Sequence, residues 1–269
     1  MKKSDVLTLL GIVSGFGMII WGMLGEAGLS IFWDTQSLAI TLGGSFCALL
    51  ITYSISDIKN IGKLIIQSMK EVAVSEIELI DSFAVISTKA RKEGLLSLEE
   101  EINEISDSYM KKGLQMVVDG VDGEIIEEIL QLEIEQMEAR HNRGINLLKA
   151  WAEYAPAFGM VGTLLGLIKM LANLGGDAES IASGMSISLI TTFYGSVLAN
   201  LIFLPFANNL TAKSKKEVAI REMMLEGILA IQSGVNPRVV EEKLSTYLGP
   251  QDKLVYLNKK LNSSEGDNK

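Results

Sequence analysis

The sequence is poor in the side chains that bind metals or react as nucleophiles. Cys47 is its only cysteine and lies in an apolar run, and His141 is its only histidine. One cysteine excludes a disulfide and a thiolate metal cluster within the chain, and one histidine excludes a multi-histidine metal site. We therefore expect no resident cofactor and no metal of the chain's own.

The sequence also lacks nucleotide-binding and catalytic motifs. Residues 162–166 read Gly-Thr-Leu-Leu-Gly without the Gly-Lys-Ser/Thr ending of a phosphate loop, and no Gly-x-Gly-x-x-Gly motif follows a strand pattern. No nucleophile, base and orienting group gather in the pattern of an enzyme site. A net charge of −9 without a basic stripe argues against nucleic-acid binding.

Long uncharged stretches are abundant. With 48% hydrophobic residues and a mean hydropathy of +0.29, the chain is too apolar for a soluble domain, while 21% charged residues require parts outside the bilayer. Each uncharged stretch is long enough to cross the hydrocarbon core as a helix. The sequence thus predicts an all-α integral membrane protein with four spans. The first two are residues 6–25 and 35–56, and the last two are the apolar segments between Trp151 and Asn208 on either side of the loop 173–180.

The distribution of Lys and Arg predicts the orientation. Two precede the first span, eleven lie in residues 57–149 and ten in residues 211–269, whereas neither short loop between paired spans has any. By the positive-inside rule both termini and the central region are cytoplasmic. We expect spans 1 and 2 in residues 1–56, a cytoplasmic helical region in 57–149, spans 3 and 4 in 150–208, and cytoplasmic C-terminal helices with a disordered tail in 209–269.

Helical periodicity divides the cytoplasmic parts further. We expect helices over residues 77–92 and 98–111 separated at Gly94, and a helix that starts near Glu124 and continues through span 3 for about fifty residues. Asn236 and Pro237 predict the start of a short helix over residues 238–247. Residues 262–269 have the composition of a disordered tail.

Small and hydroxyl side chains interrupt the last two spans at helical spacing. Helical geometry predicts that each set shares one helix face, and each span also has one proline, Pro156 or Pro205. The sets are Gly159, Thr163 and Gly166 in span 3, and Ser188, Thr192 and Ser196 in span 4. They fit close helix packing, and they also fit an ion path in which hydroxyls and freed carbonyls replace water; both interpretations stay open.

No Asp or Glu lies at the middle of any predicted span. Because a cation or proton carrier normally needs a carboxylate inside the bilayer, conduction along the last two spans requires a carboxylate from a partner chain. The sequence alone therefore predicts a heteromer.

Two segments of the last two spans form a recognisable pattern. Residues 154–167 read Tyr-Ala-Pro-Ala-Phe-Gly-Met-Val-Gly-Thr-Leu-Leu-Gly-Leu, and residues 191–200 read Thr-Thr-Phe-Tyr-Gly-Ser-Val-Leu-Ala-Asn before Pro205. These segments resemble the MotA/PomA family of bacterial flagellar stator proteins, a branch of the MotA/TolQ/ExbB channel superfamily. Residues 90–94 with Leu98-Glu99, and the Asn236-Pro237 pair, match the same family. The resemblance covers essentially the whole chain.

The resemblance implies a bacterial inner-membrane motor protein without enzymatic activity. It implies five copies around two copies of a MotB-like, peptidoglycan-binding partner, whose single span brings an aspartate to the ion path. Ion binding to that aspartate would shift helices at Pro156 and Pro205 and turn the ring within the lipid. Arg91 and Glu99 correspond to the charges that engage the rotor switch ring; without the family match they read as a solvated helix surface.

The coupling ion and two other functions stay open. Sodium-type members resemble this chain in their adjacent threonines, here Thr191 and Thr192, so Thr163, Thr191 and Thr192 with the partner's aspartate could hold a transient Na⁺; the alternative is a proton. Ser188 and Ser196 would complete the path. An ExbB/TolQ-like proton-channel energiser is a second candidate, although such chains usually have three spans, and a non-conducting membrane scaffold is a third.

Overall fold

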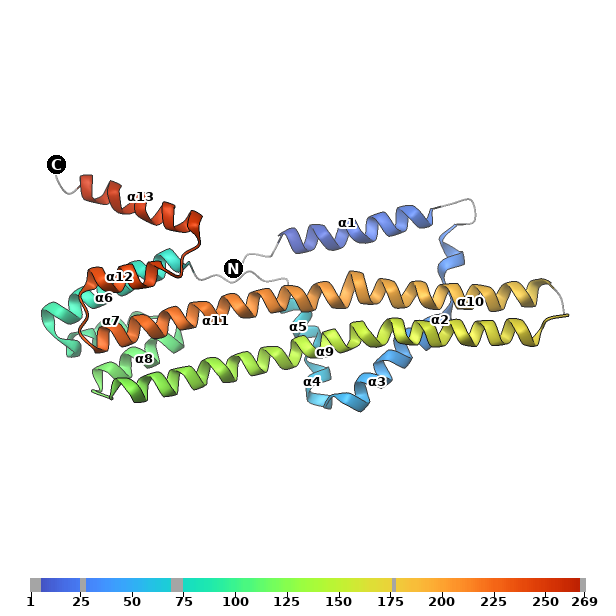
Figure 1. The fold of residues 1–269 in the computed structure, drawn as a ribbon, viewed down its shortest axis with the longest axis horizontal. Coiled ribbons are helices and arrows are strands. Elements are labelled where there is room, and N and C mark those ends of the chain that lie inside the picture. The colour runs from blue at the N-terminus through green and yellow to red at the C-terminus, as the bar shows by residue number, and fades with distance from the viewer. Residues whose placement is uncertain (1–5, 25–27, 69–74, 176–177, 267–269) are drawn as a thin grey trace. The chain divides into compact units, whose positions relative to one another are not determined.

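The computed structural model describes residues 6–24, 28–68, 75–175 and 178–266, and these residues are arranged almost entirely as helices (Figure 1). The chain divides into two compact units. Unit 1 combines Met1–Glu71 with Arg140–Lys213, and unit 2 combines Val72–Ala139 with Ser214–Lys269. The boundaries of these units differ from those of the four predicted segments, because residues 57–68 and 140–149 belong to the unit that contains the apolar helices.

Unit 1 contains the apolar helices. Three described helical stretches are long and apolar enough to cross a membrane, namely Leu29–Thr52, Gly123–Ala172 and Ala178–Gln232, and Leu10–Met23 is a shorter apolar helix. The described residues thus support three of the four predicted spans by length and composition. The unit comprises α1 (Val6–Met23), η1 (Leu29–Phe32), α2 (Thr35–Leu38), η2 (Ala39–Gly43), α3 (Gly44–Thr52), α4 (Ile55–Lys59), α5 (Ile61–Ser68), the C-terminal part of α9 (Gly123–Ala172), α10 (Ala178–Val197), η4 (Leu198–Phe203) and the start of α11 (Leu204–Gln232).

Unit 2 is a helical domain around one apolar core. It comprises α6 (Glu76–Glu93), η3 (Leu95–Leu98), α7 (Glu99–Glu104), α8 (Ser108–Val118), α12 (Pro237–Ser245), α13 (Pro250–Gly266) and the remaining parts of α9 and α11. Phe83, Tyr109, Leu130, Ile228 and Leu244 are fully buried in its core. Such burial is the main stabilising contribution to a domain of this kind.

Two helix predictions are confirmed. α9 is a single helix of 50 residues that passes through Pro156 without ending. α12 begins after Asn236, whose side chain accepts a hydrogen bond from the Arg238 amide at 3.1 Å, with Pro237 in the first turn.

Two other predictions are wrong. The helix expected over residues 98–111 is two helices, because Asp107 accepts hydrogen bonds from the amides of Tyr109 and Met110 and so begins α8. The disordered tail expected over 262–269 is helical as far as Gly266, since α13 continues from Pro250; residues 267–269 lie outside the described part of the chain. In contrast, the break at Gly94 is confirmed, with φ +88° closing α6.

Candidate functional site

The C-terminal half of α9 and α10 lie side by side in unit 1 (Figure 1), and glycines allow their close approach. A Cβ atom added to Gly195 would lie 2.7 Å from the Ala155 carbonyl oxygen and 3.0 Å from the Pro156 Cα. A Cβ atom on Gly162 would lie 2.4 Å from the Thr191 side chain. The sequence analysis overlooked these two contacts, although both glycines lie within the family motifs, and together they fix the distance between the two helices.

Four hydroxyl residues meet across this helix pair, and we call Thr163, Ser188, Thr191 and Thr192 the hydroxyl cluster. The hydroxyl oxygens of Thr163 and Thr192 are 2.6 Å apart. The Ser188 carbonyl oxygen lies 3.1 Å from each of the three threonine hydroxyls. The Ser188 hydroxyl in turn donates to the Thr163 carbonyl at 2.9 Å. The structure therefore brings together the three threonines that the sequence analysis proposed as ion ligands.

The hydroxyl cluster has more acceptor positions than hydrogens. Each threonine hydroxyl carries one hydrogen, and one carbonyl oxygen has two lone pairs, so the three hydroxyls cannot all donate to Ser188 at once. Thr163 has a further acceptor, the Gly159 carbonyl at 3.1 Å. The cluster can therefore adopt several hydrogen-bond arrangements, and it presents oxygen atoms of the kind that replace water around a small cation.

Ser188, Thr192 and Ser196 follow one another at four-residue spacing in α10, but they differ in burial. Ser188 is 4% exposed and Thr191 is fully buried, both against α9, whereas Thr192 and Ser196 are exposed in the isolated chain. Eight residues turn an α-helix by about 80° beyond two full turns, so the three side chains span one broad face, with Ser188 at the edge that packs on α9 and Ser196 at the exposed edge. Thr192 lies between the buried and the exposed side of α10, because its hydroxyl contacts Thr163 while its side chain remains exposed.

Further polar contacts support α10 from residues that the sequence analysis did not select. The Thr41 hydroxyl donates to the Ser37 carbonyl at 2.9 Å and lies 3.4 Å from the Thr191 carbonyl. Tyr194 donates its hydroxyl hydrogen to the Phe32 carbonyl and accepts a hydrogen bond from the Asp34 amide at 3.2 Å. No periodicity within α10 could have indicated these partners, since they come from residues at least 150 positions earlier.

The two prolines have different surroundings. Pro156 lies within α9 and faces Gly195 of α10 at one of the close backbone contacts of the pair. Pro205 is the second residue of α11 and follows η4, a π-helical segment over Leu198–Phe203. A proline removes one backbone donor, and the wider π turn is a known way to relieve the resulting misfit. Sequence reasoning did not predict this π segment.

Arg91 and Glu99 lie in unit 2 on either side of the Gly94 break, Arg91 in the last turn of α6 and Glu99 at the start of α7. Both side chains are exposed. A neighbouring ion pair joins these two helices, with Lys89 Nζ 2.9 Å from Glu101 Oε1. The hydrogen bond to Glu101 raises the pKa of Lys89 above its ordinary value. This pair fixes the local geometry of the surface that presents Arg91 and Glu99.

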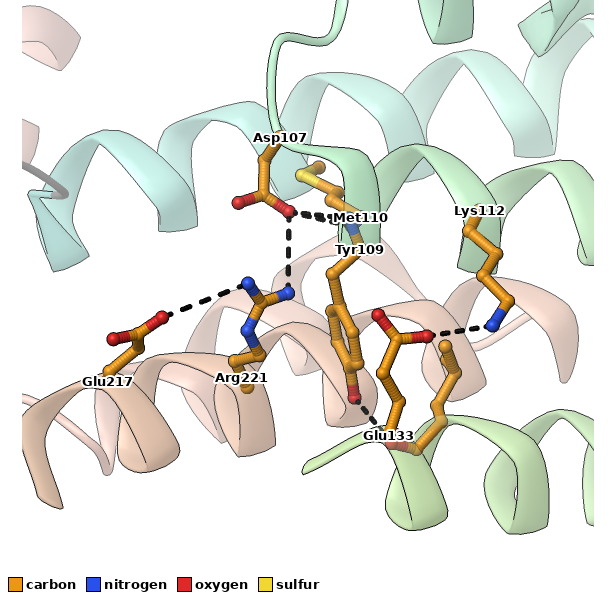
Figure 2. Close-up of polar contacts among 8 residues, drawn as sticks. Asp107, Tyr109, Met110, Lys112, Glu133, Glu217 and Arg221 are labelled. Carbon is orange, nitrogen blue, oxygen red and sulfur yellow. Dashed lines mark hydrogen bonds and ion pairs between the residues drawn. The ribbon is translucent and has the colours of Figure 1, made fainter. Parts of the chain in front are cut away.

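Unit 2 contains a second group of polar contacts, which was not predicted from the sequence. Figure 2 shows Arg221 of α11 between Asp107 and Glu217, with the hydroxyl of the neighbouring Tyr109 directed toward α9. The Arg221 guanidinium lies 4.6 Å from the centre of the Tyr109 ring, and the Tyr109 hydroxyl donates to the Leu130 carbonyl at 3.3 Å. Burial raises the pKa of Tyr109 well above its ordinary value. The group joins α8, α9 and α11.

Among the described residues, His, Cys, Asp and Glu form no group of three or more that could hold a metal ion.

Comparison with known proteins places the chain in a family. Residues 101–223 match the MotA/TolQ/ExbB proton channel family. The chain is 42% identical over 263 residues to Motility protein A of Borreliella burgdorferi, covering 97% of this chain and 99% of that one. It is 35% identical over 244 residues to the chemotaxis protein PomA of Vibrio alginolyticus, covering 91% and 95%.

A solved structure agrees. In the flagellar MotAB stator complex from Bacillus subtilis, one chain superimposes on 94% of this chain with a TM-score of 0.86 and 34% sequence identity, and 99% of that chain is covered. The resemblance identified from the sequence motifs is thereby confirmed. The chain belongs to the motility protein A family, within the MotA/TolQ/ExbB proton channel family.

Proposed function

We propose that this chain is the ion-conducting and force-generating subunit of a flagellar stator. The observation that carries the proposal is the hydroxyl cluster, which sets three threonine hydroxyls around one backbone carbonyl between two apolar helices. The family membership supports it, because the related solved complex is a flagellar MotAB stator. The chain acts as a membrane protein with four spans, cytoplasmic termini and a bacterial inner-membrane location.

A carboxylate from a MotB-like partner completes the ion path. The exposed face of α10 carries Thr192 and Ser196, so it offers oxygen atoms to a helix packed beside it. Five copies of this chain would surround two copies of the partner. Ion binding neutralises the partner's carboxylate, and this change in charge alters the packing of α9 and α11 near Pro156 and Pro205. Each elementary charge that crosses the membrane supplies about 2.3 kcal/mol per 100 mV.

Arg91 and Glu99 transmit the motion to the rotor switch ring. Their exposure on both sides of a rigid turn suits contact with a charged partner surface, and the nearby Lys89–Glu101 pair holds the two helices together. An ExbB/TolQ-like energiser is the second candidate function, since the matched channel family includes both groups. The segment around Arg91 and Glu99 favours the stator.

The first experiment compares ion flux in liposomes that contain this chain alone and with its single-span partner. We expect flux only with the partner, because no carboxylate lies in the middle of the spans. Substantial flux from the chain alone would contradict the heteromeric ion path. It would also weaken the case for a stator that conducts only with a MotB-like partner.

The second experiment identifies the coupling ion. The adjacent Thr191 and Thr192 favour sodium, because Na⁺ needs several oxygen ligands, whereas a proton needs the carboxylate and a water path. Rotation speed is measured at fixed voltage and pH while external sodium is replaced by potassium. We expect the speed to fall as sodium is removed. An unchanged speed would reject sodium in favour of the proton.

A further inference from the structure

A basic pocket lies in unit 1 between α4, α5 and α9. Its volume is about 240 Å³. Its lining includes three cationic side chains, one carboxylate, two amides and an apolar floor; those that matter here are Asp57, Lys63, Leu64, Arg140, Arg143 and Gly144. The ion path and the rotor-facing charges do not use this pocket.

Within the described part of the chain, Lys63, Arg140 and Arg143 form neither a hydrogen bond nor an ion pair. Asp57, the one lining carboxylate, instead accepts a hydrogen bond from the Ser54 hydroxyl at 2.6 Å at the start of α4. Three cations against one engaged carboxylate leave a net positive pocket with free donors, which favours an anion.

The pocket is built by close helix packing. A Cβ atom on Gly144 of α9 would lie 2.8 Å from Leu64 of α5, so the two helices touch at the floor. On α5, Ile61 and Ser68 are buried, while Ile66 is 57% exposed near Lys63. Apolar side chains exposed beside cations are typical of a helix at a membrane surface.

On the proposed membrane placement, the pocket lies at the level of the lipid headgroups. Arg143 precedes the half-buried Trp151 by eight residues, about 12 Å along α9. Tryptophan prefers the interface between hydrocarbon and headgroups, and long arginine side chains extend toward that interface. The three cations therefore lie on the cytoplasmic side, where anionic lipids accumulate.

We propose that this pocket binds the phosphate of an anionic phospholipid headgroup from the cytoplasmic leaflet. Basic pockets beside spanning helices on that side bind such headgroups. The volume is below the range of pockets that enclose a whole small-molecule ligand, so it suits a headgroup whose acyl chains stay in the bilayer. The inference rests on the proposed membrane placement of unit 1, not on ion conduction or torque.

The experiment measures lipid binding by native mass spectrometry of the assembled complex in detergent. Phosphatidylglycerol, phosphatidylcholine and inorganic phosphate are titrated separately against wild type and against Lys63→Gln, Arg140→Gln, Arg143→Gln and their triple combination. Lys59→Gln is the matched control, since Lys59 is an exposed cation of α4 outside the pocket lining. Arg143→Lys keeps the charge and controls for altered folding.

We expect wild type to retain phosphatidylglycerol in preference to phosphatidylcholine. Each cation near a membrane surface contributes about 1 kcal/mol, so each single substitution should weaken binding roughly fivefold and the triple variant roughly a hundredfold. Lys59→Gln and Arg143→Lys should bind nearly as wild type. The lipid assignment would be overturned if the triple variant retained phosphatidylglycerol as well as wild type does. It would also be overturned if Lys59→Gln weakened phosphatidylglycerol binding as much as the pocket substitutions do, or if inorganic phosphate bound as tightly as phosphatidylglycerol. None of these results bears on stator function, which the flux measurement tests separately.

Discussion

The two units differ in the polar contacts that join their helices. In unit 1 the polar side chains buried between the apolar helices are hydroxyls that donate to backbone carbonyls, such as Thr41, Ser188 and Thr191. In unit 2 ion pairs join the helices, for example Lys89 with Glu101 and Lys112 with Glu133 at 2.7 Å. Because both units consist of packed helices, we attribute this difference in polar contacts to the medium around each unit, hydrocarbon for unit 1 and water for unit 2.

This contrast follows from the cost of an unpaired group in each medium. Hydrocarbon offers no hydrogen-bond partners, so a hydroxyl in a spanning helix bonds to its own backbone and leaves few groups unsatisfied. Water solvates charges well, so exposed ion pairs cost little to form and contribute little. Unit 1 is therefore suited to passing an ion between oxygen atoms, and unit 2 to presenting charges at a surface.

The largest expected effect is on the core of unit 2. Phe83 is fully buried, and its ring fills the space beside Gly227. Phe83→Ala should lower the stability of unit 2 by about 3 to 5 kcal/mol through lost burial and a cavity. Hydrogen exchange of the full chain should show lost protection in α8 and unchanged protection in α10. The control is Val85→Ala, because Val85 is on the same helix but exposed. If Phe83→Ala lost protection equally in α8 and α10, the two units would not be separate in stability.

A smaller effect is expected at the helix pair of unit 1. Gly195→Ala places a methyl group 2.7 Å from the Ala155 carbonyl oxygen, and backbone cannot yield as a side chain can. The two helices must separate, at a cost of about 1 to 3 kcal/mol. Thermal unfolding of the assembled complex should occur at lower temperature. The control is Gly17→Ala in α1, where a methyl group meets open space, and it should leave the unfolding temperature unchanged. Equal unfolding temperatures for the two variants would rule out a tight contact between Gly195 and Ala155.

Double-mutant cycles sharpen the comparison at the level of single pairs. The Thr163–Thr192 pair should show a coupling energy of about 0.6 kcal/mol, and the Lys89–Glu101 pair a small coupling, because solvent screens its charges. Only the second coupling should fall when salt is raised, because salt screens exposed charges and not hydroxyls. Valine replaces each threonine, and methionine and glutamine replace Lys89 and Glu101. A salt-sensitive threonine coupling would contradict the assignment of these hydroxyls to a dry environment.

The smallest expected effect concerns alkaline pH and unit 2. Burial, followed by the charge of Glu241, raises the pKa of Tyr256 from 10.0 to about 12. Because the folded pKa is the higher one, the folded state retains a proton that the unfolded state has lost between pH 10 and 12. Stability from this group is complete below pH 10 and declines as pH rises toward 12. Tyr256→Phe should unfold with a shallower pH dependence in that range; an identical slope would remove Tyr256 as a contributor.

Sequence periodicity predicted the long elements better than their ends. The fifty-residue α9 and the Asn236 cap follow from local signals, namely apolar spacing, the absence of a stop, and a side chain that accepts an amide hydrogen. The division at Asp107 was missed because its capping competes with an apolar pattern that would also suit one helix. The continuation of α13 to Gly266 was missed because a polar composition does not by itself prevent a helix.

The candidate site was predictable in its residue types and only partly in its geometry. Thr163, Thr191 and Thr192 were chosen from their residue type and spacing, and in the structure their hydroxyls meet at the Ser188 carbonyl oxygen. The burial of Ser188 and the exposure of Ser196 depend on how α10 packs against α9. The contacts of Thr41 and Tyr194 arise from distant parts of the chain, so no local pattern contains them.

The central claim is that the hydroxyl cluster passes the ion and the exposed charges of unit 2 pass the force. Ion flux and motor torque measured on the same assembled complexes test it directly, with Thr192→Val for the cluster and Arg91→Glu for the charges. Thr192→Ser, which keeps the hydroxyl, and Lys92→Glu, which reverses a neighbouring exposed charge, are the matched controls. We expect Thr192→Val to lose both flux and torque, and Arg91→Glu to lose torque while flux persists. Normal flux in Thr192→Val, or loss of flux in Arg91→Glu, would contradict this division of roles.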